Sequence, residues 1–239
     1  MHLVEDIIAY KLGKKAGGGG GGGSSFPVGK IKTAGNLFYN ATFDSEDIVF
    51  DFGGATFDTG LNGVASTFRI AKNGDLLHTL TIKNIVLSNV SFESAFRTTA
   101  IKKIIFENAV VAPSSLSMAF YYSSNLETIT WEIDCSYCLN FNNTFARCDN
   151  LKDITFKPNT IKANVLLSHS GALTETSLIS IANGLDGTVT GQTLTLHATS
   201  KTTCDSLMGT NDNGTFVPDA QGTLSLSDFI TTVKGWTLA

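Results

Sequence analysis

The chain has 239 residues and a net charge of −4, and only 16% of its residues are charged. This length allows one sizeable domain with an appendage, and the weak negative charge argues against a nucleic-acid surface. No apolar run approaches the roughly 18 residues of a membrane-spanning helix, so membrane insertion is not expected.

Residues 1–15 form the first predicted element, an anchoring segment with an amphipathic helix at residues 3–15. Its acidic residues come first and its lysines last, the order that the helix dipole favours. It lacks the positive start and the long apolar core of a signal peptide. A helix of about 13 residues is marginal in isolation, so we expect it to dock on another protein. The apolar side chains expected to form this anchor are Leu3, Val4, Ile7, Ile8 and Leu12.

Residues 16–25 form a low-complexity linker, in which Ala16 is followed by seven glycines and two serines. We interpret it as a flexible tether, since seven glycines span about 15 Å as a random coil. A leader without a role is the alternative. A phosphate-binding loop is not supported, because the run lacks the G-K-[ST] sequence. Residues 26–46 are then predicted to form an amino-terminal cap.

A repeated phrase, L-x-x-I-x-[IF] in its general form, organises residues 47–198. It begins at residues 77, 101, 126 and 151, so the repeats are 24 or 25 residues long. Its alternation predicts one half-buried strand per repeat, and such coils must stack because none covers its own apolar face. The sixth positions are expected to form one interior row: Ile82, Phe106, Trp131 and Phe156. The predicted fold class is therefore mainly β, a short leucine-rich-repeat-like solenoid with short helices towards the carboxy terminus.

Two further apolar positions recur along the repeats, the second of which fails in the fourth repeat, at Ser170. The first lies fifteen residues after the start of the phrase, at Phe92, Leu116, Phe141 and Leu166. The second lies nineteen residues after the start, at Phe96, Phe120 and Phe145. An earlier strand is predicted at residues 48–52, ahead of the first complete phrase.

The junction between repeats resembles a known family. Residues 144–151 read Thr-Phe-Ala-Arg-Cys-Asp-Asn-Leu, which is similar to the junction of BspA-type leucine-rich repeats in bacterial and phage surface proteins. Two earlier junctions, at residues 95–101 and 119–126, carry it without the cysteine. The resemblance covers about residues 47–198 and implies a leucine-rich-repeat solenoid, while its implication for function is weaker.

The pattern changes after residue 166, where helices are expected between strands. The predicted elements are a helix at 175–183, a strand at 193–196, a helix at 199–208, a loop at 211–222, a helix at 225–234 and a strand at 236–238. Residues 199–239 are predicted to form the carboxy-terminal cap that an open repeat stack needs. The endings 177–185 and 235–239 resemble the close of repeat proteins encoded by phages of gut bacteria.

The outward strand positions form the candidate ligand face. They are Thr79, Thr81, Lys83, Lys103, Ile105, Glu107, Thr128, Thr130, Glu132, Asp153, Thr155 and Lys157. Three are basic and three are acidic, so a groove for a polyanion is not expected there. Hydroxyl-rich strands with scattered charge suit contact with sugars or protein, and a merely solvated face is the alternative.

The residues that commonly carry chemistry do not form a convincing site. Cys135 and Cys138 make a C-x-x-C pair, for which zinc binding and a disulfide are alternatives to buried thiols. The four histidines do not cluster in the sequence, and no hydrolase or metalloprotease motif is present. No cofactor, metal ligand or catalytic residue is therefore assigned, and an enzyme is not expected.

The resemblance to BspA-type and phage-encoded repeat proteins, together with the missing export signal, implies a phage virion protein of the tail, the baseplate or the particle surface. Residues 1–25 would bind other virion proteins, and the solenoid would bind a host-surface glycan or protein through weak, multivalent contacts. Without an export signal, assembly in the host cytoplasm is expected. A homo-oligomer is compatible with the sequence, although no heptads support one. The alternatives are a bacterial surface adhesin, a depolymerase enzyme and a passive decoration protein without a ligand.

Overall fold

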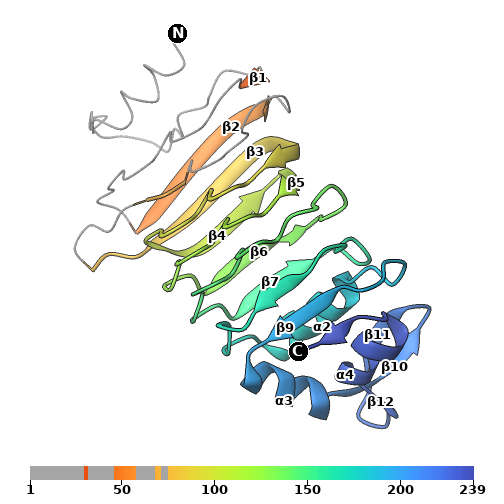
Figure 1. Cartoon of the computed structure of the whole chain (residues 1–239). Helices are drawn as coiled ribbons and strands as arrows, with labels where there is room; N and C mark the ends of the chain where they lie inside the picture. Colours follow the sequence, from red (N-terminus) through yellow and green to blue (C-terminus); the bar gives the residue numbers. More distant parts are fainter. Residues whose placement is uncertain (1–29, 32–45, 58–67, 71–74) are drawn as a thin grey trace, which may run out of the picture.

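The computed structural model describes residues 30–31, 46–57, 68–70 and 75–239 (Figure 1). Within these residues the chain is mainly β and forms a β-solenoid of about five turns with a few short helices. Figure 1 shows the strands stacked in chain order, with the helices gathered towards the carboxy-terminal end. The predicted anchoring helix, the polyglycine linker and most of the predicted amino-terminal cap lie outside the described residues.

One parallel sheet forms most of the solenoid. Its strands, in spatial order, are β1 (Lys30–Ile31), β2 (Asp47–Phe57), β3 (His78–Ser91), β4 (Ile101–Glu107), β6 (Thr128–Ile133) and β7 (Asp153–Phe156). The long strand β3 pairs with β4 through its first half and with β5 (Val110–Ser115) through its second half. The strand predicted at residues 48–52 is confirmed as part of β2, whose register with β3 shifts between Asp51 and Ala55.

Two rows of apolar side chains line the interior of this sheet. The first row joins Ile48, Leu80, Ile104 and Ile129 in register, and each side chain is at most 3% exposed. The second row joins Phe50, Ile82 and Phe106 in register. The repeated phrase therefore packs its fourth and sixth positions against the same positions of neighbouring coils, as its alternation predicts, although Phe106 is only partly buried.

The predicted row of sixth positions is correct for Ile82, Phe106 and Trp131 but wrong at its fourth member. The rings of Phe106 and Trp131 lie 4.4 Å apart. The register between β6 and β7 then shifts, and Phe156 pairs with Ile133 instead of Trp131. The spacing of the phrases could not predict this shift, because the number of residues between phrases does not depend on the register in which the strands pair.

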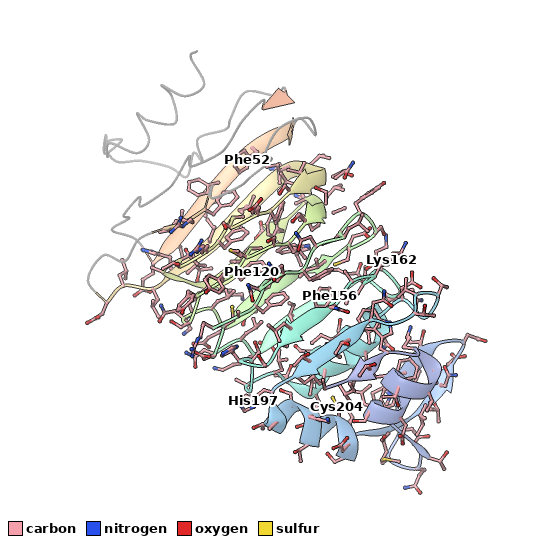
Figure 2. The ribbon with its side chains drawn as sticks, in the orientation of Figure 1. Phe52, Phe120, Phe156, Lys162, His197 and Cys204 are labelled. Carbon is pink, nitrogen blue, oxygen red and sulfur yellow. The ribbon has the colours of Figure 1, made fainter. Side chains whose placement is uncertain are left out.

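The predicted position nineteen residues into each repeat forms a column of stacked rings. Neighbouring rings of Phe68, Phe96, Phe120 and Phe145 have centroids 5.1, 5.3 and 5.4 Å apart, with planes within 12° of parallel. This separation is close to the spacing of about 4.8 Å between paired strands, so each ring rests on the ring of the next coil. In Figure 2, Phe120 lies inside the stack, between the levels of Phe52 and Phe156.

The predicted position fifteen residues into each repeat is confirmed in three of four coils. Phe92, Leu116 and Phe141 are buried, but the next coil buries Leu167 and leaves Leu166 partly exposed. Backbone hydrogen bonds identify the equivalent residue, because Ser170 donates to the carbonyl of Leu167 as Ala95 does to that of Phe92. That coil is one residue longer than the sequence period suggested.

Left-handed backbone turns recur at equivalent positions beside the phenylalanine column. Ser94, Met118 and Asn143 form one series, with φ between 52° and 55°. A second series, Thr98, Tyr122 and Arg147, has φ of 53°, 59° and 62°. A positive φ is costly for a side chain other than glycine, asparagine or aspartate, so these turns hold strain that stacking must offset.

Replacing Thr98 by glycine is expected to raise the free energy of unfolding by about 1 kcal/mol. The β-branched threonine is exposed at a φ of 53°, which costs about 1–2 kcal/mol, and glycine removes that cost while losing part of it to chain entropy. Urea denaturation would measure the change. Asn143→Gly is the matched control and should change stability by less than about 0.5 kcal/mol, since asparagine tolerates this conformation. A destabilised Thr98→Gly variant would contradict the prediction.

Helix α2 (Glu175–Gly184) covers the edge of the large sheet beyond β7. Thr174 caps the helix, because its hydroxyl accepts a hydrogen bond from the Ser177 N–H. The hydroxyls of Ser177 and Ser180 accept hydrogen bonds from the backbone N–H groups of Ile154 and Phe156 at 3.0 and 2.8 Å. They replace the carbonyls of a further strand, so this edge is not left open for pairing with another chain.

The rest of the stack forms a second parallel sheet of β8 (Val165–Leu167), β9 (Thr193–Leu196) and β13 (Thr237–Leu238). The predicted strand at 193–196 is confirmed, and the strand predicted at 236–238 is confirmed for its last two residues. Helix α3 (Ala198–Ser206) confirms the short helix predicted at 199–208, with ends one and two residues earlier.

Two predictions for the carboxy-terminal segment need correction. The loop predicted at 211–222 contains a hairpin of β10 (Met208–Asp212) and β11 (Thr215–Pro218), with β12 (Leu224–Ser225) paired to β10. Its turn is Asn213-Gly214, both with positive φ, which suits a two-residue hairpin. The helix predicted at 225–234 is divided into α4 (Leu226–Asp228) and the π-helical η1 (Phe229–Val233).

Candidate recognition surface

The candidate ligand face consists of side chains that align in columns across the sheet. The first column is Thr79, Lys103, Thr128 and Asp153; the second is Thr81, Ile105 and Thr130; the third begins with Lys83 and Glu107. The register shift places Thr155 opposite Glu132, and Lys157 follows the end of β7. The sheet therefore brings the predicted residues together on one face, because parallel strands in register repeat their outward positions.

Exposure along this face is uneven. Thr81 is only 8% exposed, and the other predicted residues of β3 are partly buried. On β6 and β7, by contrast, Thr130, Glu132 and Thr155 are exposed. The accessible part of the predicted face therefore lies mainly on the later coils.

Lysines on and beside this face are paired with carboxylates of neighbouring coils. Lys83 lies 2.6 Å from Glu107, and Lys102 and Lys152 lie on either side of Glu127 at 3.7 and 2.9 Å. The hydrogen bond from Lys152 lowers the pKa of the Glu127 carboxyl. Exposed pairs of this kind contribute little stability, but they cancel charge and leave no field of one sign.

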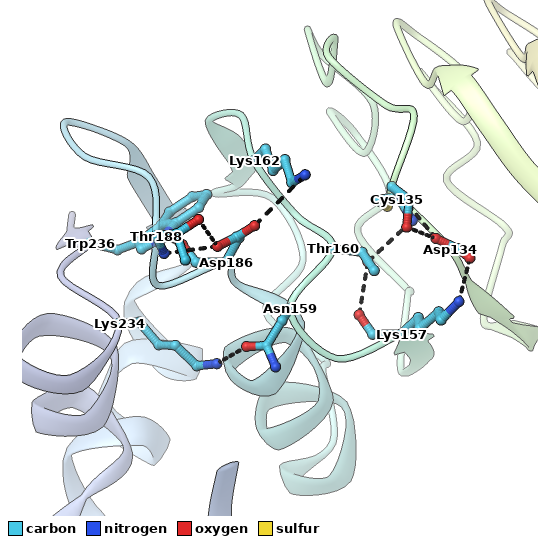
Figure 3. A network of polar contacts seen from close by, with 11 residues as sticks. Asp134, Cys135, Lys157, Asn159, Thr160, Lys162, Asp186, Thr188, Lys234 and Trp236 are labelled. Atoms are coloured by element: carbon cyan, nitrogen blue, oxygen red, sulfur yellow. Dashed lines mark hydrogen bonds and ion pairs between the residues drawn. The ribbon is translucent and has the colours of Figure 1, made fainter. Parts of the chain in front are cut away.

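A further polar network joins the later coils (Figure 3). Lys157 donates a hydrogen bond to Asp134 at 2.7 Å. Burial alone would raise the pKa of Asp134, but hydrogen bonds from Lys157 and Ser136 outweigh it and hold this pKa below its ordinary value. The Thr160 hydroxyl accepts from the Cys135 N–H at 3.2 Å. Together these contacts fix the turn that follows β6.

The carboxy-terminal segment is attached by buried polar contacts, also drawn in Figure 3. The Trp236 indole N–H donates to the backbone carbonyl of Asp186 at 3.0 Å, and the Lys234 ammonium donates to Asn159 at 2.6 Å. Burial lowers the pKa of Lys234, and the nearby Asp186 partly opposes that shift. These partners explain how Lys234 can be 2% exposed, since a buried charge needs hydrogen-bonded compensation. We assign them a structural role.

The four cysteines are buried and none of them forms a disulfide, which agrees with the interpretation of the C-x-x-C pair as buried thiols. Cys148 donates to the carbonyl of Phe120 at 3.0 Å, as Ser123 donates to the carbonyl of Phe96 at 2.6 Å in the preceding coil. The cysteine of the junction therefore satisfies a buried backbone carbonyl. Burial raises the pKa of Cys148 and of Cys204 to about 12.

Stability is expected to fall between pH 9 and 11 because these thiols must stay protonated in the folded state. Their ordinary pKa is 9.0, so the thiols of the unfolded chain lose their protons at a lower pH than those of the folded chain. The free energy of unfolding therefore falls by about 1 kcal/mol per thiol at pH 10. Chemical denaturation at pH 8 and pH 10 would measure this loss. In Cys204→Ala the loss should be smaller by the share of one thiol, and an equal loss in parent and variant would contradict the assignment.

The described residues contain no group of three or more His, Cys, Asp or Glu side chains arranged to hold a metal ion. His169 contacts the Ser168 hydroxyl at 3.3 Å, and His197 accepts from the Thr199 N–H at the start of α3. The structure thus gives His197 a capping role that the sequence analysis did not predict. No helix in the described part of the chain has the length and apolar character to cross a membrane.

A second surface, which the sequence analysis missed, lies at the turns that follow the stacked phenylalanines. All three arginines of the chain are found there, Arg69 and Arg97 one residue and Arg147 two residues after a ring of the column. Tyr121 and Tyr122 occupy the same two positions after Phe120. We call these five residues the arginine edge. The sequence signal for this surface is an arginine or tyrosine one or two residues after each phenylalanine of the column.

The five anchor residues at positions 3–12 lie outside the described residues, so their grouping on one helix stays a prediction. No family model, curated protein or solved structure matches the chain. The features of the molecule that bear on its function are therefore its repeats and the geometry of their surfaces.

Proposed function

We propose that the chain is a structural protein of a phage virion that displays a BspA-type leucine-rich-repeat domain for adhesion to the host surface. It would belong to the tail, the baseplate or another appendage at the particle surface. Residues 1–25 would attach it to other virion proteins, and the solenoid would face outward. The proposal involves no cofactor, catalysis, nucleic acid or membrane insertion.

The observation that best supports a binding role is the in-register alignment of outward side chains over successive coils. Thr130, Glu132 and Thr155 are accessible there on a rigid parallel sheet. A repeated surface presents similar groups many times, and many copies on one particle would turn a weak contact into useful avidity. The family resemblance of the repeat junctions supports a surface protein, while the buried cores of the coils explain why the display is rigid.

The location of the protein tests the virion assignment. Immunogold labelling is expected on purified particles, and deletion of residues 1–15 is expected to release the protein from them. Label on washed bacterial cells instead would favour the bacterial adhesin. A protein that stays on particles after the deletion would exclude residues 1–15 as the anchor.

Adsorption of particles to host cells tests the adhesive role. Particles whose protein lacks residues 47–239 are expected to adsorb less than particles with the full chain. Unchanged adsorption would favour a passive decoration protein. Incubating the purified protein with host capsule provides the enzymatic control, because shortening of the polysaccharide would favour a depolymerase.

A further inference from the structure

In the described coils, Arg97 and Arg147 of the arginine edge lack the carboxylate partners that several lysines of the solenoid have. Lysines 83, 102, 152, 157 and 162 each lie within 4.0 Å of a carboxylate. Within the described part of the chain, neither Arg97 nor Arg147 forms an ion pair. Arg97 and Arg147 therefore offer positive charge that no ion pair among the described residues neutralises.

The side chains of this edge hold one another in place. The Arg97 guanidinium lies 5.0 Å from the centre of the Tyr121 ring, and the Tyr121 and Tyr122 rings meet edge to face at 4.5 Å. The Arg69 Nε donates to the backbone carbonyl of Arg97 at 3.2 Å. Stacking on an aromatic ring orients a guanidinium before any ligand arrives, and so reduces the entropy lost on binding.

The backbone places these side chains on adjacent coils. The N–H of Thr98 donates to the carbonyl of Tyr121, and the N–H of Tyr122 donates to the carbonyl of Ala146, both at 2.9 Å. Arg97, Tyr122 and Arg147 therefore belong to three successive coils. Tyr122 is 50% exposed although it is a large aromatic residue, and Arg147 is exposed beside it. The arrangement is a row of cations and rings that runs along the solenoid.

One polar atom of this row has no hydrogen-bond partner among the residues that the structure describes. The Nε of Arg97 is inaccessible to solvent and forms no hydrogen bond. A buried donor without a partner is uncommon in native structures. The same guanidinium faces the Tyr121 ring, and no carboxylate of the described residues forms an ion pair with it.

We propose that the arginine edge binds an acidic polysaccharide whose sugars carry carboxylates, such as a polymer of uronic acid. Arginine matches the planar carboxylate with two parallel hydrogen bonds, which lysine cannot reproduce. The exposed tyrosine ring offers an apolar face for sugar C–H groups and a hydroxyl for hydrogen bonding. A linear polymer places carboxylates and rings in a row, as the edge does. This inference deepens the proposed adhesion and rests on it for its biological setting.

Titration of the full chain with polygalacturonate tests the site directly. We expect binding at low salt that weakens at high salt, and an Arg97→Gln/Arg147→Gln double variant should raise the Kd by at least about tenfold, corresponding to about 1.4 kcal/mol. Lys162→Gln/Lys201→Gln is the matched control, since it removes the same charge from the turn before β8 and from α3, outside both the arginine edge and the sheet face. The control should change the Kd by less than about twofold, as expected for charges outside the site. Circular dichroism would verify that each variant folds.

Three further arms define the ligand class. Arg97→Lys/Arg147→Lys keeps the charge and is expected to bind more weakly than the parent, because the paired hydrogen bonds are lost. Tyr122→Ala should weaken binding of polygalacturonate more than binding of polyglutamate, which has carboxylates but no sugar rings. Fully methyl-esterified polygalacturonate should not bind.

Several results would overturn the assignment. They are an absence of parent binding to polygalacturonate, equal losses in the two glutamine double variants, or equal affinity for the esterified polymer. Tighter binding of polyglutamate would assign the edge to an acidic peptide instead. If particles with the Arg97→Gln/Arg147→Gln protein adsorb normally although polysaccharide binding is lost, the site stands and its adhesive role fails. If the same variant keeps polygalacturonate binding while truncated particles fail to adsorb, adhesion stands and this site is wrong.

Discussion

Replacing Phe120 by alanine is expected to lower the free energy of unfolding by about 3–5 kcal/mol, the usual cost of removing a buried aromatic ring. Phe120 is fully buried. Its ring stacks between those of Phe96 and Phe145 at 5.3 and 5.4 Å, and its centroid lies 6.5 Å from that of Trp131. The cavity would open in the middle of the column, where rigid coils on both sides prevent collapse.

The loss should also affect cooperativity, because stability in a repeat stack depends on contacts between neighbours. Urea denaturation followed by tryptophan fluorescence and by circular dichroism would measure both effects, since Trp131 and Trp236 report on different parts of the chain. Tyr137→Ala provides the control, because that ring is 52% exposed and its removal should cost less than about 0.5 kcal/mol. A Phe120→Ala variant that loses less than about 1 kcal/mol would show that the column does not carry the core.

Replacing Gly222 by alanine is expected to lower the free energy of unfolding by about 3 kcal/mol, at the upper end for overpacking. The added methyl group would overlap the carbonyl oxygen of Gly209 and lie 2.5 Å from its carbonyl carbon. Gly209 belongs to β10, which pairs with β11 on one side and β12 on the other. Backbone held on both sides cannot move aside as a flexible side chain could.

Thermal unfolding and limited proteolysis would measure this effect, with cleavage expected first within the hairpin segment 208–225. Gly187→Ala is the matched control, because the nearest atom to its added methyl group lies at 3.6 Å and the glycine is exposed. That variant should be neutral, or more stable by up to about 1 kcal/mol through reduced entropy of the unfolded chain. Equal behaviour of the two variants would contradict the assigned contact between residues 209 and 222.

The candidate surfaces differ in how far the sequence could identify them. The columns of the sheet face follow from the alternation within the phrase, and the structure shows Thr128 beside Asp153 and Lys103 beside Thr128. The exposure of these side chains could not be predicted from the same alternation, because Thr81 points outward on its strand and is nevertheless nearly buried. The arginine edge also escaped prediction, since its members become neighbours only when coils separated by about 25 residues are stacked.

Local periodicity was sufficient to predict a stack of parallel coils, the burial of the phenylalanine column and most carboxy-terminal elements, because those features depend on which residues leave water. The register of Phe156 against Ile133 and the pairing of β13 with β9 depended on contacts between distant segments. The same is true of Ser177 and Ser180, whose hydroxyls take the place of a strand at the edge of β7. Which of these contacts forms depends on the relative energies of alternative packed structures of the whole chain. The spacing of residues along the sequence carries no information about those energies.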